Sequence, residues 1–121
     1  MASAQDGSSH NVYWYGGFDG IDFKGELDGD VWVLSIPSFI WMRVDSGNQS
    51  RTRACHVCAK PYPDQMIIIG GYTSLAGDNI ECLGSGFVQV FNLSDLTWLS
   101  GYDPMVWSNY SVPSLLSDKI G

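Results

Sequence analysis

The chain has 121 residues, of which 45% are hydrophobic and 13% aromatic, and it carries a formal net charge of -7 from 13 acidic and 6 basic side chains. This acidic balance argues against nucleic acids and anionic membrane surfaces as partners, because both are bound through clustered Lys and Arg. The hydrophobic and aromatic content is too high for a disordered acidic segment, so most of the chain is expected to fold.

Short segments rich in Val, Ile, Trp, Tyr and Phe alternate with clusters of Gly, Pro, Ser, Asn and Asp, which is typical of strands and turns. No stretch shows convincing helical periodicity. The predicted strands are, in chain order, residues 11–17, 30–36, 40–45, 54–60, 65–71, 87–93 and a shorter 97–101. Residues 1–10 and 18–29 are expected to be flexible. The sequence therefore predicts an all-β fold.

An internal repeat is visible when Tyr15-Gly16-Gly17 is laid over Ile69-Gly70-Gly71, and Trp41 over Trp98. Each copy has an apolar strand ending in Gly-Gly, a variable loop, a second strand (VWVLSI or VQVFNL), a tight turn and a Trp. A period of about 50 residues with four strands per unit is the spacing of kelch-type propeller blades.

These motifs resemble a kelch repeat over residues 11–121. More narrowly, DVWVLSIPSFIWMRV, RACHVC, DQMIIIGG and the tail from Tyr110 resemble the C-terminal blades of fungal secreted or membrane-anchored kelch proteins. The resemblance implies a partial kelch β-propeller of about two four-stranded antiparallel blades. The expected organisation is a flexible start at 1–10, a partial blade at 11–45, a second blade at 54–101, and at 102–121 a linker with the start of a next or closing strand.

The resemblance assigns structural roles to the repeated residues. In a kelch blade the second strand passes close to neighbouring backbone, where glycine avoids a clash, and the closing Trp buries a large surface between blades. The structural positions are Gly16, Gly17, Gly70, Gly71, Trp41 and Trp98. The loops 18–29 and 72–86 then point to the face that the family uses for partner contacts, so a protein or carbohydrate partner is expected there.

Acidic residues gather in and next to the first of these loops. They are Asp19, Asp22, Glu26, Asp28 and Asp30. Their spacing does not match a calcium-binding loop with Asp at the first, third and fifth positions and Glu at the twelfth. A solvated acidic loop without a metal is expected.

Cys55 and Cys58 form a CxxC motif, and Cys82 follows. A zinc site would need four ligands, and a redox CxxC motif usually begins a helix, so neither interpretation is well supported. In the proteins that the chain resembles, a cysteine at the start of the blade pairs with one in the long loop. That resemblance implies a disulfide between Cys55 and Cys82, with Cys58 either buried as a small apolar group or paired outside the chain.

Three N-glycosylation sequons begin at Asn48, Asn92 and Asn109, and they favour a secretory route. The first ten residues show no signal peptide, and the longest apolar stretch is shorter than the roughly 20 residues that span a bilayer. We therefore expect an extracellular or cell-surface ectodomain whose signal and anchor lie outside this chain, with no membrane insertion within it.

Some kelch-type propellers resemble galactose oxidase, a copper enzyme that uses two tyrosines and two histidines. This chain offers only His10 and His56, and no catalytic set can be assembled. The expected function is therefore a non-catalytic recognition module without cofactor, as a fragment of a larger propeller. The alternatives are a fragment of a copper enzyme whose ligands lie outside the chain, or a truncated product without independent function.

Overall fold

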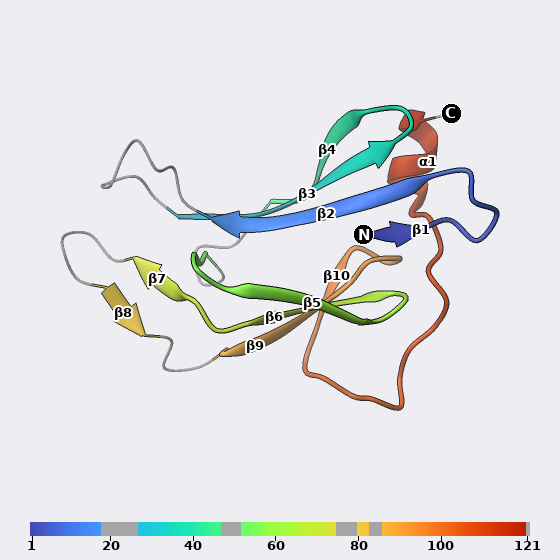
Figure 1. Cartoon of the computed structure of the whole chain (residues 1–121). Helices are drawn as coiled ribbons and strands as arrows, with labels where there is room; N and C mark the ends of the chain where they lie inside the picture. The colour runs from blue at the N-terminus through green and yellow to red at the C-terminus, as the bar shows by residue number, and fades with distance from the viewer. Residues whose placement is uncertain (18–26, 47–51, 75–79, 83–85, 121) are drawn as a thin grey trace.

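The computed structural model describes residues 1–17, 27–46, 52–74, 80–82 and 86–120 (Figure 1). The elements within them are β1 (Ala2–Ser3), β2 (His10–Gly17), β3 (Asp28–Ile36), β4 (Ile40–Asp45), β5 (Val57–Tyr62), β6 (Gln65–Ile69), β7 (Tyr72–Ser74), β8 (Ile80–Cys82), β9 (Val88–Asn92), β10 (Thr97–Leu99) and α1 (Ser114–Ile120). All seven strands predicted from the sequence are present, with shifted ends.

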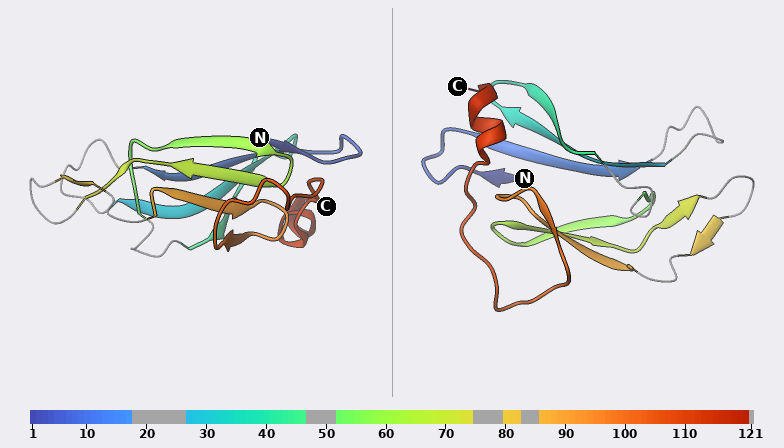
Figure 2. Two further views of the ribbon diagram at one scale, coloured as in Figure 1. Left: turned by 90° about the horizontal axis from the view of Figure 1, so that it is seen from below. Right: turned by 180° about the vertical axis from the view of Figure 1, so that it is seen from behind.

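The strands form two four-stranded antiparallel sheets that lie over one another as layers (Figures 1 and 2). The first sheet has the order β1-β2-β3-β4, and the second has the order β10-β9-β6-β5. β7 and β8 pair with each other in the connection between β6 and β9. The predicted all-β fold with two four-stranded antiparallel units is confirmed.

The main core lies between the two sheets. In β3 the buried side chains alternate with partly exposed ones, so that Val31 and Val33 face inward, as expected for a strand with one buried face. The buried hydrophobic residues of this cluster are Ala2, Tyr15, Val31, Met66, Ile68, Phe91, Leu93 and Tyr110. This core joins the two predicted repeats into one folded unit.

The start of the chain is ordered, in contrast to the predicted flexible segment 1–10. Ala2 pairs with Asn11 in the ladder between β1 and β2, and its side chain is buried. The turn between these strands has Gly7 at φ 73°, next to a hydrogen bond from the Ser8 N–H to the Asp6 carboxylate at 2.9 Å. β1 is an edge strand of the first sheet and brings its number of strands to four. The unit predicted as a partial blade from residue 11 is therefore four-stranded.

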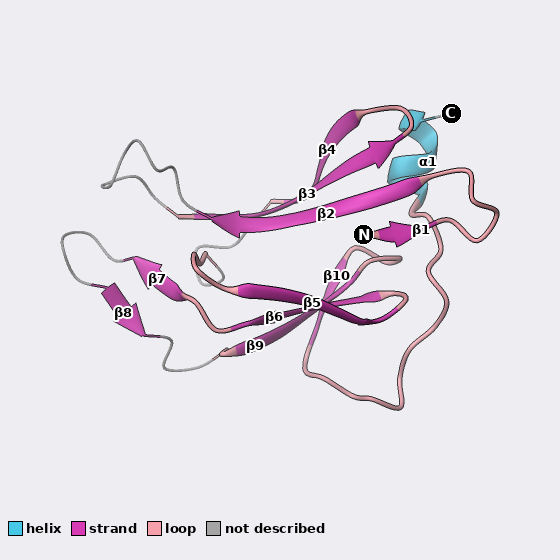
Figure 3. Ribbon diagram, in the orientation of Figure 1, coloured by secondary structure: helices cyan, strands magenta, loops and turns pink. Residues whose placement is uncertain are grey.

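The end of the chain also differs from its prediction. Residues 102–121 were expected to hold a linker and the start of a strand, but Ser114–Ile120 forms the helix α1 (Figure 3). Leu116 is fully buried against Val33 and Met42 of the first sheet. A helix this short depends on such tertiary packing more than on its own propensity. Among the described residues, no helix is both long and apolar enough to cross a membrane.

Candidate functional site

The two double glycines lie at the same end of the two sheets, on the left of Figure 1, beside the segment 53–56. Gly16 and Gly71 have φ values of 63° and 89°, which favour glycine. A Cβ on Gly16 would lie 2.8 Å from the Arg53 carbonyl oxygen, and one on Gly71 would lie 2.7 Å from the Ala54 carbonyl oxygen. One short segment therefore lies close to both Gly16 and Gly71. The close approach predicted for Gly17 and Gly70 is not seen among the described residues, since a Cβ there would meet no atom within 4 Å or only the Phe87 ring.

This segment also joins the ends of the strands by backbone hydrogen bonds. The Gly17 N–H donates to the Arg53 carbonyl at 3.0 Å, which ties the end of β2 to the segment. Ala54 and Tyr72 exchange two hydrogen bonds at 3.0 and 3.1 Å, which tie the start of β7 to it. The two long connections that leave β2 and β6 thus begin from a common, hydrogen-bonded base.

The Arg53 side chain holds both ends of the second connection. Its guanidinium donates to the Gly70 carbonyl at 3.2 Å and to the Gly86 carbonyl at 2.9 Å, and the residue is only 1% exposed. Hydrogen bonds from a charged donor are stronger than neutral ones, so this pair stabilises the base of the connection. Sequence reasoning missed Arg53, because its partners are backbone carbonyls, which carry no residue-specific signal.

His56 lies at the same base, between the sheets. Its ring packs edge-on against Tyr15 with the ring centroids 5.1 Å apart. Burial lowers the pKa of His56, and the nearby Arg53 charge lowers it further. The sequence placed His56 in a packed or turn-facing role, and it packs here.

The two repeated tryptophans differ in burial. Trp98 packs edge-on against Tyr15 and Phe91, with ring centroids 5.4 and 5.0 Å apart, and its indole N–H donates to the Asp45 carboxylate at 2.9 Å. It therefore joins the two sheets, as its predicted role requires. Trp41 is 54% exposed, so among the described residues it does not bury the large surface that its predicted role requires.

The cysteines do not form the expected pair in this structure. Cys55 and Cys58 both carry free thiols and are exposed, which corrects the alternative that Cys58 is buried. Ala54 and Cys82 both pair with Tyr72. The Tyr72 N–H and carbonyl both form hydrogen bonds with Ala54, so Ala54 and Cys82 lie on opposite sides of Tyr72. β7 therefore runs between the segments that carry Cys55 and Cys82. The Cys82 side chain lies outside the described part, and its disulfide with Cys55 stays a prediction.

The three sequons occupy different settings. Asn48 lies outside the described residues. The Asn92 side-chain oxygen accepts hydrogen bonds from the Ser94 and Asp95 N–H groups at 2.9 and 2.8 Å, so Asn92 shapes the turn before β10. Asn109 is exposed and precedes α1. Its position suits modification, and glycosylation of all three stays a prediction.

The predicted partner loops lie mostly outside the described residues, namely at 18–26, 75–79 and 83–85. Of the acidic cluster, Asp19, Asp22 and Glu26 fall in that part. Asp28 accepts a hydrogen bond from the Asp30 N–H, and Asp30 forms an ion pair with Arg43 at 3.3 Å. Within the described ranges, no group of three or more His, Cys, Asp or Glu side chains could hold a metal ion.

The two histidines lie too far apart to share a metal. His10 begins β2, and His56 contacts Tyr15, five residues further along that strand. Five residues of strand span about 17 Å, whereas two nitrogen ligands of one ion each lie about 2 Å from it. The two-histidine copper arrangement therefore cannot be built from these residues.

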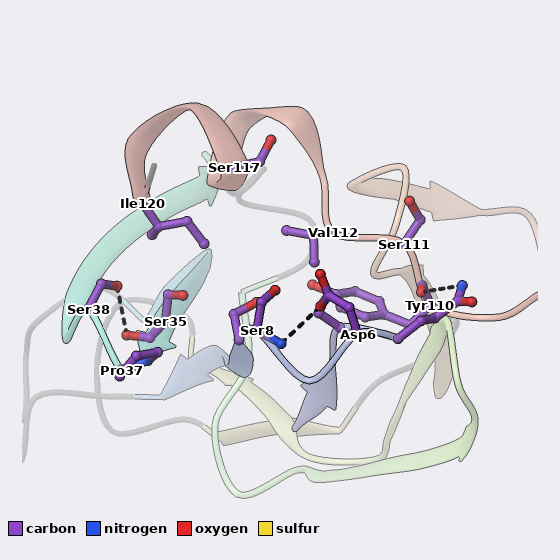
Figure 4. Close-up of a pocket in the computed structure, with 13 residues that line it drawn as sticks. Asp6, Ser8, Ser35, Pro37, Ser38, Tyr110, Ser111, Val112, Ser117 and Ile120 are labelled. Carbon is purple, nitrogen blue, oxygen red and sulfur yellow. Dashed lines mark hydrogen bonds between the residues drawn. The ribbon is translucent and has the colours of Figure 1, made fainter.

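A cavity of about 740 Å³ lies at the opposite end of the sheets (Figure 4). The turns after β1 and β3 line it together with the segment around α1. Six of its lining residues are serines: Ser8, Ser9, Ser35, Ser38, Ser111 and Ser117. Their hydroxyl groups and the Asp6 carboxylate suit hydrogen bonding to a polar molecule. Sequence reasoning missed this cavity, because it joins segments about 100 residues apart and includes the helix that was not predicted.

One relative is a kelch repeat-containing protein of Arthroderma benhamiae (strain ATCC MYA-4681 / CBS 112371), which is 38% identical over 111 residues. The match covers 89% of this chain and 16% of the relative, so the chain spans only a small part of that protein. No protein-family model and no solved structure matches the chain. Together with the two four-stranded sheets and the repeated double glycine, this similarity supports the assignment of the chain to the kelch-repeat family.

Proposed function

We propose that the chain is a non-catalytic recognition module, part of an extracellular kelch propeller of which it supplies C-terminal blades, and that it binds a protein or glycan through the connections 18–29 and 72–86. The observation that carries this proposal is the common base from which both connections begin. A rigid scaffold that presents long loops from one end is a frequent arrangement of binding proteins.

The base is suited to this role because it is rigid where the loops begin. The Arg53 guanidinium holds the carbonyls of Gly70 and Gly86, which flank the second connection. The Arg53 carbonyl accepts a hydrogen bond from the Gly17 N–H at the start of the first connection. Loops anchored at both ends lose less conformational entropy when they bind. Sequence variation within the loops can then change the partner without changing the sheets.

A non-catalytic role is supported by the name of the relative, which describes repeats and no reaction. It is also supported by the separation of His10 and His56. The rival proposal is a copper enzyme whose ligands lie outside this chain, and copper content and peroxide production from sugar alcohols by the intact parent protein test it. An active, copper-replete preparation would overturn the non-catalytic proposal.

The binding proposal is tested on the intact parent protein with a glycan array and with immobilised candidate cell-surface proteins. In one variant, residues 75–79 are replaced by a Gly-Ser segment of equal length. The matched control alters the exposed β1–β2 turn at Asp6-Gly7-Ser8, which lies at the other end of the sheets. We expect the loop variant to lose binding and the control to keep it. Binding that survives in both variants, or no binding at all, would contradict the proposal.

The extracellular location is tested separately by expressing the parent in a eukaryotic secretory host. Removal of N-linked glycans by an amidase should increase gel mobility, and Asn109→Gln should remove one glycan. Retention of an unglycosylated protein inside the cell would contradict this location.

A further inference from the structure

The cavity at the end opposite the partner loops has walls from three segments that are far apart in the sequence (Figure 4). The β1–β2 turn forms one wall, the β3–β4 turn forms a second, and the segment 110–112 forms a third together with α1. The volume of about 740 Å³ lies within the range of about 300 to 1,000 Å³ that is typical of small-molecule sites. No described residue of the connections 18–29 and 72–86 lines it, so a ligand there would be independent of the partner loops.

The floor of the cavity is polar and has an unused hydrogen-bonding group. The lining residues Ala4, Ser9, Ser35 and Tyr110 are buried, so they lie beneath the exposed rim. Ser35 is 0% exposed, and within the described part of the chain its hydroxyl has no hydrogen-bond partner. Buried hydroxyl groups are nearly always hydrogen-bonded to protein or to an ordered water. The floor can therefore take one more hydrogen bond than the chain itself supplies.

The serines of the rim are oriented as hydrogen-bond acceptors. The Ser38 hydroxyl donates to the Ser35 carbonyl at 3.1 Å, and the Ser117 hydroxyl donates to the Ser114 carbonyl at 3.1 Å. A hydroxyl whose proton is used in this way still has lone pairs that accept. Two opposite walls of the cavity therefore offer oxygen atoms to a molecule that brings its own donors.

The β1–β2 turn adds two more acceptors. The Asp6 carboxylate accepts a hydrogen bond from the Ser8 N–H at 2.9 Å, and hydrogen bonds from Ser8 lower the pKa of Asp6, so this group is charged at neutral pH. The Gln5 side-chain nitrogen donates to the Tyr110 carbonyl at 3.3 Å, which leaves the Gln5 side-chain oxygen as an acceptor. A ligand that fits this rim must supply several donors at once.

Charge narrows the class of ligand further. Asp6 is the one charged side chain among the described residues that line the cavity, so no Lys or Arg would balance an anion. Phosphates and carboxylates are therefore disfavoured. Asp6 is exposed, so solvent and salt screen its attraction for a cation. Val112 and Ile120 place apolar surface beside the hydroxyl groups.

We propose that this cavity binds a small, uncharged, polyhydroxylated molecule, namely one sugar ring or sugar alcohol. Its hydroxyl groups donate to the Ser38 and Ser117 oxygens and to the Asp6 carboxylate, while its C–H face lies on Val112 and Ile120. An open site for a ligand of about 12 non-hydrogen atoms binds with a dissociation constant of about 1 mM.

The proposal is tested by two-dimensional NMR titration of the isotope-labelled full chain. The neutral probes are glucose, galactose, mannose and mannitol, and the charged comparisons are glucose 6-phosphate and putrescine. We expect at least one neutral probe to shift the amide signals of residues 5–9, 35–38 and 110–120, with saturation in the range of about 1 mM. The two charged compounds should bind at least about tenfold more weakly. The same neutral probe should bind the intact parent protein in calorimetry.

Variants of α1 locate the site. Ser117→Phe should fill the cavity and abolish the saturable shifts. Asp118→Phe, at the next residue, is the matched control, because Asp118 is exposed and does not line the cavity. Ser38→Ala and Ser117→Ala each remove one acceptor and should weaken binding by about threefold to tenfold. Circular dichroism should show that all four variants are folded.

Two further variants separate this site from the partner loops. Replacing residues 75–79 by a Gly-Ser segment should leave sugar binding in the cavity unchanged. Altering the turn at Asp6-Gly7-Ser8 should weaken it, although the binding that depends on the loops is kept.

Four outcomes would overturn the proposal. None of the neutral probes could give saturable shifts at the cavity. Glucose 6-phosphate or putrescine could bind as tightly as the sugars, which would indicate a different class of ligand. The folded Ser117→Phe variant could bind like the wild type, which would place the sugar elsewhere. The intact parent could fail to bind a sugar that the chain binds, which would show that another part of the parent fills the cavity.

Discussion

Replacing Gly71 with alanine should destabilise the fold strongly, because two separate costs meet at this position. Its φ of 89° costs an ordinary residue about 1 to 3 kcal/mol. The new Cβ would also lie 2.7 Å from the Ala54 carbonyl oxygen, which accepts the hydrogen bond from Tyr72. Moving that oxygen strains the packing by about 1 to 3 kcal/mol. The expected loss in the free energy of unfolding is therefore about 2 to 6 kcal/mol, a large share of a typical total of about 5 to 15.

The neighbouring glycine provides the matched control. Gly70 has a similar φ of 67°, but a Cβ there would meet only the Phe87 ring, at an ordinary contact distance of 3.5 Å. Gly70→Ala should therefore cost only the backbone strain, about 1 to 2 kcal/mol. Urea unfolding followed by tryptophan fluorescence gives both values from the shift in midpoint at a common slope. An equal or larger loss for Gly70→Ala would refute the argument that the Ala54 carbonyl sets the requirement for glycine.

Three further substitutions test the contacts between the sheets. Trp98→Ala should lower the free energy of unfolding by about 3 to 5 kcal/mol. Trp41→Ala should lower it by less than about 1 kcal/mol, because Trp41 is exposed. Urea unfolding compares the two variants. Arg53→Met should lower the free energy of unfolding by about 2 to 4 kcal/mol, since two carbonyls lose a charged donor. It should also speed amide hydrogen exchange in β7. Arg43→Met, the control, breaks a surface ion pair and should lower the free energy of unfolding by at most about 1 kcal/mol. Burial lowers the pKa of His56, so the folded state resists its protonation. Stability should fall as the pH drops below the ordinary value of 6.5, and His56→Gln should reduce that slope in pH-dependent urea titrations; an unchanged slope would contradict this role.

The seven predicted strands are present because each combines β-forming residues with a turn signal at its boundary. Of the aligned double glycines, Gly16 and Gly71 lie where backbone passes close to backbone. Gly17 and Gly70 have no such neighbour among the described residues, because the motif marks the turn and not which of its two glycines meets the facing segment. The two-residue β1 escaped prediction because Ala2 and Ser3 have no strand preference, and pairing with Asn11 and His10 fixes them. The helix α1 escaped because its stability comes from Leu116, which packs against side chains more than 70 residues away in the sequence.

Trp41 and Trp98 show that a repeat predicts the position of a residue in its sheet better than the stabilisation that the residue provides. Both occupy the same place in their sheet, next to Leu34 or Phe91 in the ladder, and both were assigned the same structural role. Trp98 has a sheet opposite it and gains ring contacts and a hydrogen bond, whereas Trp41 faces outward. The residue type follows from the repeat, but the stabilisation follows from the neighbour. The energetic role of each repeated residue therefore depends on what packs against it.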